Sequence, residues 1–214
     1  MPGTEIRRAE PSEHQAIGYL TASTYLAEGF AGPDYAETLR DVAARAPHST
    51  ILVALTDGQL SGSVTVVTAG GPYAESTPPG TAVLRMLVTD PAFRGAGVGT
   101  ALVQAAIAES RAAGCTMLRL STGPGMTAAH RLYASLGFRR VPEQDWSPEP
   151  GVELMVCELP LVYCPHCGDP GNHAACRTDL DPPRYCAHCG RRMTVQVHPT
   201  GWTARCVEHG ITQG

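Results

Sequence analysis

The 214-residue sequence contains no lysine, and all 16 of its basic residues are arginine. The formal net charge of −4 is small, so the overall charge indicates neither nucleic acid nor an anionic membrane as a partner. Aromatic residues are also scarce, at 6% of the chain. An apolar fraction of 43% nevertheless suits a globular protein with a sizeable core.

Long apolar runs are absent as well. No run approaches the length of a membrane span, and we expect no membrane association. The opening residues, MPGTEIRRAEPSE, lack the apolar segment of a secretory signal. We therefore expect a cytoplasmic protein. Because disulfides are rare in the cytoplasm, clustered cysteines there indicate metal binding.

The eight cysteines are unevenly distributed. Cys115 and Cys157 lie alone in apolar segments, where we expect small buried side chains. The other six follow Leu161, and this shift in composition predicts two domains, residues 1–160 and 161–214.

Strand and helix patterns alternate through the first 160 residues. We expect a helix over 12–29, with Ser12 as N-cap and Gly29 at its end, and a helix over 33–46, with Pro33 in the first turn. Two more helices are expected over 97–114 and 126–137, each ending at a glycine. Two β-branched segments joined by Asp57-Gly58 predict a hairpin. This order predicts an α/β domain whose sheet begins antiparallel and contains a helical crossover.

The segment VTDPAFRGAGVGTALV carries the clearest chemical signal. A strand runs into a glycine-rich turn from which a helix begins, and free N–H groups at such a helix start favour a phosphate. The glycine spacing does not match the dinucleotide-binding fingerprint, and the Gly-Lys-Ser/Thr ending of a P-loop is missing. The segment therefore predicts a different kind of phosphate-binding turn.

In these residues the sequence resembles the GNAT acetyltransferase family. Arg94, Gly97 and Gly99 match the family signature Arg/Gln-x-x-Gly-x-Gly/Ala, and AAHRLYASLGF matches a second signature, a helix with tyrosine followed by Gly-Phe. The resemblance covers residues 4–160. It implies a GNAT-like mixed central sheet with flanking helices, and transfer of an acetyl group from acetyl-CoA to an amine.

The resemblance also implies roles for single residues. Backbone N–H groups of the turn would cradle the coenzyme A pyrophosphate, from Arg94, Gly95, Ala96, Gly97, Val98, Gly99 and Thr100. Leu87 and Val88 would pair with the pantetheine arm. Tyr133 would act as general acid and protonate the leaving coenzyme A thiolate.

Two departures from the family leave the acceptor open. Met126 stands where many members carry asparagine, and the central strand, Leu84-Arg85-Met86-Leu87, has no carboxylate where many carry a glutamate base. Glu28, Glu153 or a bound water are the alternatives for the base.

The last fifty residues have few large apolar side chains, and such a short segment rarely folds without a staple. Cys-x-x-Cys-Gly occurs twice with a zinc-site spacing, and a third turn reads Cys-x-x-His-Gly. A hairpin over 193–206 would complete one Cys3His set: Cys186, Cys189, Cys206 and His209. The remaining candidates form a second set: Cys164, Cys167, His173 and Cys176.

A rival pairing joins the two Cys-x-x-Cys turns at one ion. We expect His166, His188 and His198 to be bystanders. Spacing favours a small cysteine-rich metal-binding ribbon, but it does not decide between zinc and an iron–sulfur cluster.

The run PPRYCAHCGRRMTVQVHPTGWTARCVEHG resembles the actinobacterial biotin synthase auxiliary protein family over residues 162–210. This implies biotin synthase, a radical enzyme, as partner. Two hypotheses follow: an acyltransferase with a metal-binding tail, or primarily an accessory protein for biotin synthase. A nucleic-acid-binding ribbon is disfavoured, because the tail balances five arginines against four acids.

Overall fold

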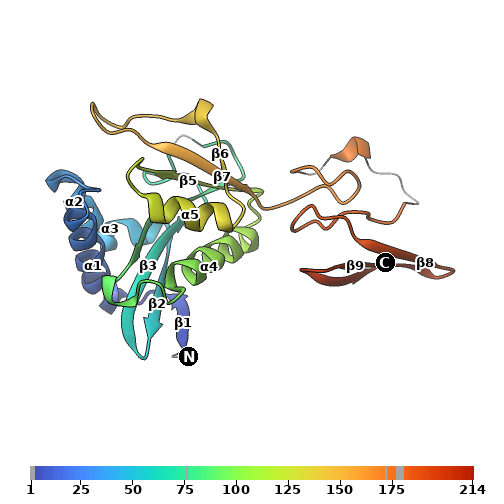
Figure 1. Ribbon diagram of the computed structural model, residues 1–214, viewed down its shortest axis with the longest axis horizontal. Coiled ribbons are helices and arrows are strands. Elements are labelled where there is room, and N and C mark those ends of the chain that lie inside the picture. The colour runs from blue at the N-terminus through green and yellow to red at the C-terminus, as the bar shows by residue number, and fades with distance from the viewer. Residues whose placement is uncertain (1–2, 76, 172, 177–180) are drawn as a thin grey trace. The chain divides into compact units, whose positions relative to one another are not determined.

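The computed structural model describes residues 3–75, 77–171, 173–176 and 181–214 (Figure 1). The chain divides into two compact units, Met1–Leu159 and Pro160–Gly214. Among the described residues, the helices are all too short or too polar to cross a membrane.

The first unit contains a seven-stranded sheet in the order β1-β2-β3-β4-β5-β7-β6. Its strands are β1 (Thr4–Arg8), β2 (Thr50–Thr56), β3 (Gln59–Val67), β4 (Thr81–Thr89), β5 (Met117–Thr122), β6 (Arg139–Arg140) and β7 (Met155–Pro160). Strands β1 to β4 pair antiparallel, whereas β4 and β5 pair parallel. This mixed sheet with flanking helices confirms the predicted α/β class.

In the described part of the first unit, five helices flank this sheet, and α1 and α2 lie side by side in Figure 1. They are α1 (His14–Ala27), α2 (Pro33–Arg40), α3 (Val42–Arg45), α4 (Val98–Ala112) and α5 (Thr127–Ser135). Helix α1 contacts β3 and β4, while α4 contacts β1 to β4. The aliphatic residues between these elements, such as Ile17, Val53 and Leu102, are fully buried and form the core.

Two helix predictions were wrong. The helix expected over 33–46 breaks at Asp41, whose ψ of 71° is not helical and whose carboxylate accepts a hydrogen bond from the N–H of Ala44 at 2.9 Å. This carboxylate caps a new helix, because it satisfies an N–H that the break leaves free. Ser12 is not an N-cap: it lies in a 3-10 turn, Pro11–Glu13, whose ends are tied by a capping box between Glu10 and Glu13.

The central strand carries an irregularity that shapes the site. The register of β4 against β3 shifts between Arg85 and Val88, and Met86 has a φ of 53°. Parallel pairing of β4 with β5 ends at Leu84 and Leu120. Among these described residues, the remaining carboxyl-terminal part of β4 therefore has no partner in β5, and its backbone can pair with a ligand.

The second unit contains a three-stranded antiparallel sheet in the order β10-β9-β8. Its strands are β8 (Thr194–His198), β9 (Gly201–Cys206) and β10 (Gly210–Gln213). The hairpin of β8 and β9 was predicted, but β10 was not. Of the described residues in this unit, five are buried: Leu161, Cys164, Cys186, Ala204 and Cys206. The core of this small unit is thus made largely of thiols.

Candidate active site and metal groups

A cavity of about 560 Å³ opens in the first unit. Its walls come from the end of α1, the end of β4, the turn before α4, and the start of α5. Of the nine residues predicted to bind the cofactor, Ala96 does not line this cavity. The other eight do: Leu87, Val88, Arg94, Gly95, Gly97, Val98, Gly99 and Thr100. Tyr133 lines the same cavity.

The glycine-rich turn presents the start of α4 to this cavity. Gly95 and Gly97 have φ of 79° and 84°, a left-handed conformation that other residues adopt at a cost. A Cβ atom at Gly99 would lie 3.3 Å from the Leu132 side chain, so α5 packs closely against this turn. The first N–H groups of the 15-residue helix have no carbonyl partners within the helix, and N–H groups in this position favour an anion.

Two tyrosines stand in the cavity wall. Tyr133 is 6% exposed and packs against Phe138 at a ring separation of 5.6 Å, and burial raises its pKa well above 10. It therefore stays protonated at neutral pH and can donate a proton. Tyr25 was not predicted as a site residue, and its hydroxyl donates a hydrogen bond to the Leu87 carbonyl at 3.1 Å. A tyrosine in a helix gives no sequence signal of this contact, because its partner lies 62 positions along the chain.

The candidate bases are placed differently. Glu28 is the one acid among the described residues that line the cavity, and it forms an ion pair with Arg94 of the glycine-rich turn. Glu153 is exposed and does not line the cavity. Met126, which replaces the asparagine of many family members, also lines the wall and accepts a hydrogen bond from Thr122 at its sulfur, at 3.4 Å.

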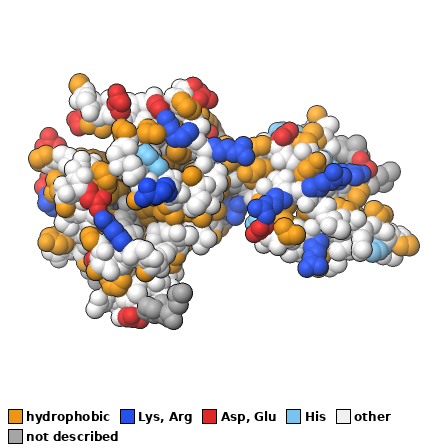
Figure 2. All heavy atoms as spheres, viewed as in Figure 1, with side chains coloured by type: hydrophobic (Ala, Val, Ile, Leu, Met, Phe, Trp, Pro, Cys, Tyr) orange, Lys and Arg blue, Asp and Glu red, His pale blue; other side chains and the backbone are white. Residues whose placement is uncertain are grey.

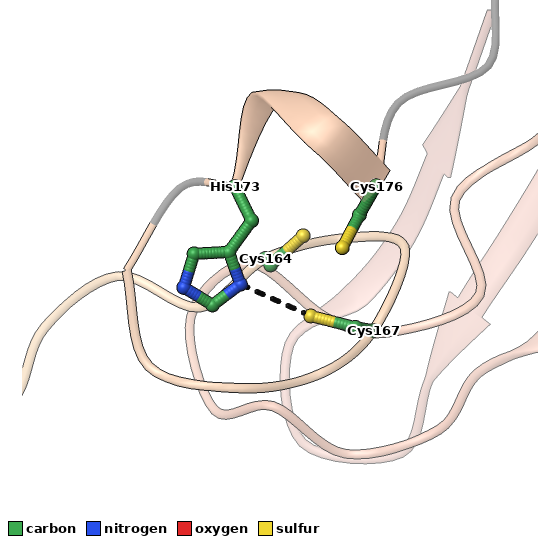
Figure 3. Close-up of side chains that lie close together, drawn as sticks. All are labelled: Cys164, Cys167, His173 and Cys176. Atoms are coloured by element: carbon green, nitrogen blue, oxygen red, sulfur yellow. Dashed lines mark hydrogen bonds between the residues drawn. The ribbon is translucent and has the colours of Figure 1, made fainter.

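The second unit brings together both predicted Cys3His sets. In each, the four potential ligand atoms lie within 4.8 Å of one another. The first metal group is Cys164, Cys167, His173 and Cys176, and the second is Cys186, Cys189, Cys206 and His209. Figure 3 shows the side chains of the first group converging, with His173 Nδ1 3.2 Å from Cys167 Sγ. The two Cys-x-x-Cys pairs thus fall in different groups, unlike in the rival pairing.

The distances within the second metal group fit one tetrahedral ion. Cys189 Sγ lies 3.8 Å from Cys206 Sγ, and His209 Nδ1 lies 3.6 Å from Cys186 Sγ and 3.7 Å from Cys206 Sγ. Zinc–ligand bonds of about 2.3 Å to sulfur and about 2.0 Å to nitrogen place tetrahedral ligands about 3.8 Å (S to S) and about 3.5 Å (S to N) apart.

Each metal group also contains a thiol whose pKa is lowered below its ordinary value. The N–H of Cys167, with other backbone donors, lowers the pKa of Cys164 to about 6. Burial opposes ionisation of Cys206, but the N–H of Glu208 and contacts with His209 outweigh it and lower its pKa to about 6. Burial raises the pKa of Cys189 to about 11. Metal binding at neutral pH would therefore release protons from the thiols still protonated.

The residues predicted to be buried hydrophobes or bystanders belong to neither metal group. Cys115 and Cys157 are buried in the first unit, and burial raises the pKa of each thiol. His166, His188 and His198 belong to neither group, although the His188 ring lies 5.3 Å from that of His209. On the face drawn in Figure 2, the arginines of the second unit are separated by apolar and neutral atoms rather than joined in one stripe.

In the first unit, the central strands of a mixed sheet separate beside a glycine-rich helix start. The second unit is a ribbon with two Cys3His groups. Together they define the class of protein: an acetyltransferase-type domain fused to a cysteine-rich module. The model of the acetyltransferase (GNAT) family matches residues 14–138, and the chain belongs to that family. The biotin synthase auxiliary protein family matches residues 193–214, so the fusion is shown.

Curated relatives match the two parts separately. The biotin synthase auxiliary protein of Mycobacterium bovis is 55% identical over 49 residues, which are 23% of this chain and 62% of that protein. The rat N-acetylaspartate synthetase is 34% identical over 112 residues, 52% of this chain and 35% of that enzyme. The chain thus spans less than two thirds of either relative.

A solved acetyltransferase structure supports the fold. The Salmonella typhimurium protein, described with its cofactor acetyl-CoA, superposes with a TM-score of 0.57 at 21% identity. The alignment covers 86% of this chain and 99% of that one.

Proposed function

We propose that the first unit transfers an acetyl group from acetyl-CoA to an amine. The observation that carries this proposal is the cavity, because its lining joins the helix start before α4, Tyr133 and the end of β4 that, among the described residues, has no partner in β5. The pyrophosphate would bind the N–H groups of the turn from Arg94 to Thr100. The pantetheine arm would pair with the backbone of Leu87 and Val88, which lie beyond the point where β4 stops pairing with β5.

Tyr133 would complete the transfer. The neutral amine attacks the thioester carbonyl, its nitrogen gives up a proton to Glu28 or to a bound water, and the tetrahedral intermediate expels the coenzyme A thiolate. Burial raises the pKa of Tyr133, so its phenol stays protonated until this moment. It would supply the proton that the thiolate takes up, because the same apolar surroundings also disfavour the charged thiolate. The name of the rat relative, N-acetylaspartate synthetase, makes aspartate and other free amino acids the first acceptors to test.

Acetyl-CoA binding, measured by calorimetry, tests this proposal. Thr100 lines the cavity in the first turn of α4, and a tryptophan there would fill the phosphate site without straining the backbone. The matched control places the same substitution one turn further along, at the exposed Gln104, which does not line the cavity. We expect Thr100→Trp to abolish binding and Gln104→Trp to preserve it. Equal binding by both variants would overturn the assignment of the site.

For the second unit, we propose that each metal group holds one zinc ion. A two-iron cluster divides its four ligands between two metal atoms, so its ligand pairs lie further apart than the ligands of one ion. Four ligand atoms within 4.8 Å, with three measured separations near the tetrahedral values, favour a single ion. When bound, zinc would cross-link the chain and supply folding free energy. Metal analysis of protein purified without oxygen tests this, and two zinc ions per chain are expected.

We also propose that the second unit supports biotin synthase. The similarity to the auxiliary protein over 49 residues carries this proposal. A biotin auxotroph that lacks its own auxiliary protein would be supplied with the full chain. Growth is expected with the intact chain and with Tyr133→Phe, but not with Cys206→Ala, which removes a metal ligand. No growth with the intact chain would refute the accessory role. Growth lost with Tyr133→Phe would instead link both units to one pathway.

A further inference from the structure

The two Cys-x-x-Cys turns of the second unit pack against each other as a reciprocal pair. The first knuckle is residues 163–168 (YCPHCG) and the second is residues 185–190 (YCAHCG), offset by 22 positions. The N–H of Tyr163 donates to the carbonyl of Ala187 at 2.9 Å, and the N–H of Tyr185 donates to the carbonyl of Pro165 at 2.9 Å. These two bonds connect equivalent positions, so the pair has an approximate two-fold relation.

The tyrosine rings repeat this exchange. A Cβ atom added at Gly168 would lie 2.6 Å from the Tyr185 ring, and one added at Gly190 would lie 2.6 Å from the Tyr163 ring. Both glycines also have positive φ, 84° and 68°, so each turn needs glycine for its conformation and for its neighbour. Each tyrosine thus covers the turn that presents the cysteines of the other metal group.

Each knuckle therefore supplies ligands to one metal group but packs against the knuckle of the other metal group. The first knuckle supplies Cys164 and Cys167 to the first metal group, but it packs on the second knuckle, which supplies Cys186 and Cys189 to the second group. Among the described residues of this unit, Leu161 and Ala204 are the only buried side chains other than cysteines that could order either turn. A turn without its ion loses a main source of order, and the turn packed against it then loses its tyrosine and its hydrogen-bond partners.

We propose that Tyr163 and Tyr185 are positioning residues that couple the two metal groups, so that zinc binding at one group strengthens binding at the other. This rests on the proposed zinc binding. By thermodynamic linkage, the factor by which the first group affects the second must equal the reverse factor. The chain would accordingly pass from metal-free to doubly loaded with little of the singly loaded form.

Zinc affinities measured by competition with a chromophoric chelator, under reducing conditions and on the full chain, test the coupling. One variant disables the first group by His173→Ala with Cys176→Ala, and another disables the second by Cys206→Ala with His209→Ala. Each leaves both knuckles intact. We expect the surviving group to bind zinc about 5-fold to 150-fold more weakly than in the intact chain, the usual range of coupling between sites, and by the same factor in both variants.

Tyrosine variants identify the link. Tyr163→Ala with Tyr185→Ala, built into all three backgrounds, should reduce the coupling factor, whereas phenylalanine at both positions should restore it because the rings remain. Val197→Ala, in the same unit and 72% exposed, is the control and should leave the factor unchanged. If disabling one group leaves the zinc affinity of the other unchanged in the chain that keeps both tyrosines, the proposed coupling is wrong. If the coupling factor is as large in the alanine variant as in that chain, the rings do not carry the coupling. If neither group binds zinc, the proposed metal binding itself fails.

Discussion

Removing the metal should unfold the second unit while the first stays folded. Only two of the five buried residues in the described part of this unit are ordinary apolar residues, Leu161 and Ala204. Complete burial of one leucine stabilises a fold by about 1.5–3 kcal/mol. A structural zinc ion in a small domain contributes about 10–16 kcal/mol, several times more. The metal-free unit is therefore expected to be unfolded at 25 °C.

Tryptophan fluorescence can follow this event in the full chain. Trp202 lies in β9, and Trp146 in the first unit would be replaced by phenylalanine so that Trp202 is the sole reporter. Addition of a strong chelator should shift the emission to longer wavelength as Trp202 becomes hydrated, and added zinc should reverse the shift. The first unit serves as the internal control, because its acetyl-CoA binding should be unaffected. An unchanged emission spectrum in protein shown to be metal-free would refute the reasoning.

Three further outcomes are expected. Glu28→Gln should tighten acetyl-CoA binding about twofold to fivefold in calorimetry, because it frees Arg94 from a half-exposed ion pair worth less than about 1 kcal/mol; weaker binding would contradict this. Tyr133→Phe should slow acetyl transfer about 10²–10⁴-fold in a coenzyme A release assay while the dissociation constant of acetyl-CoA stays within twofold, since only the proton donor is lost. The hydrogen bond from Arg140 lowers the pKa of Asp145 to about 2. The ionised Asp145 carboxylate therefore stabilises the folded first unit above about pH 4, and this stabilisation is lost as the pH falls towards 2. Asp145→Asn should therefore flatten the decline of stability over that interval, measured by urea titrations, and an unaltered pH dependence would argue against it.

The parts of the fold that follow local rules could be predicted from the sequence. Gly29, Gly114 and Gly137 each lie just beyond a helix end, with φ between 71° and 91°, as their positions in the helical patterns predicted. The Asp57-Gly58 hairpin forms for the same reason: both residues adopt the positive φ that a tight turn requires.

Features that depend on long-range competition could not be predicted. Nothing local distinguishes Asp41 from a residue in a continuous helix, because its carboxylate caps a new helix only once the chain has turned. The hydrogen bond from Tyr25 to Leu87 joins residues 62 positions apart. The ligand sets followed from spacing, but the packing of Tyr163 on Gly190 did not, since it depends on two turns meeting face to face.

The buried thiols of the second unit give its fold a chemical condition. Cys164, Cys186 and Cys206 are at once its interior and three of its proposed metal ligands. Oxidation of a thiolate removes a ligand and inserts oxygen or a disulfide where close packing is required. Loss of metal, loss of packing and exposure of the chain to proteases would then be a single event. The lifetime of this unit would accordingly follow the redox state and zinc supply of its surroundings.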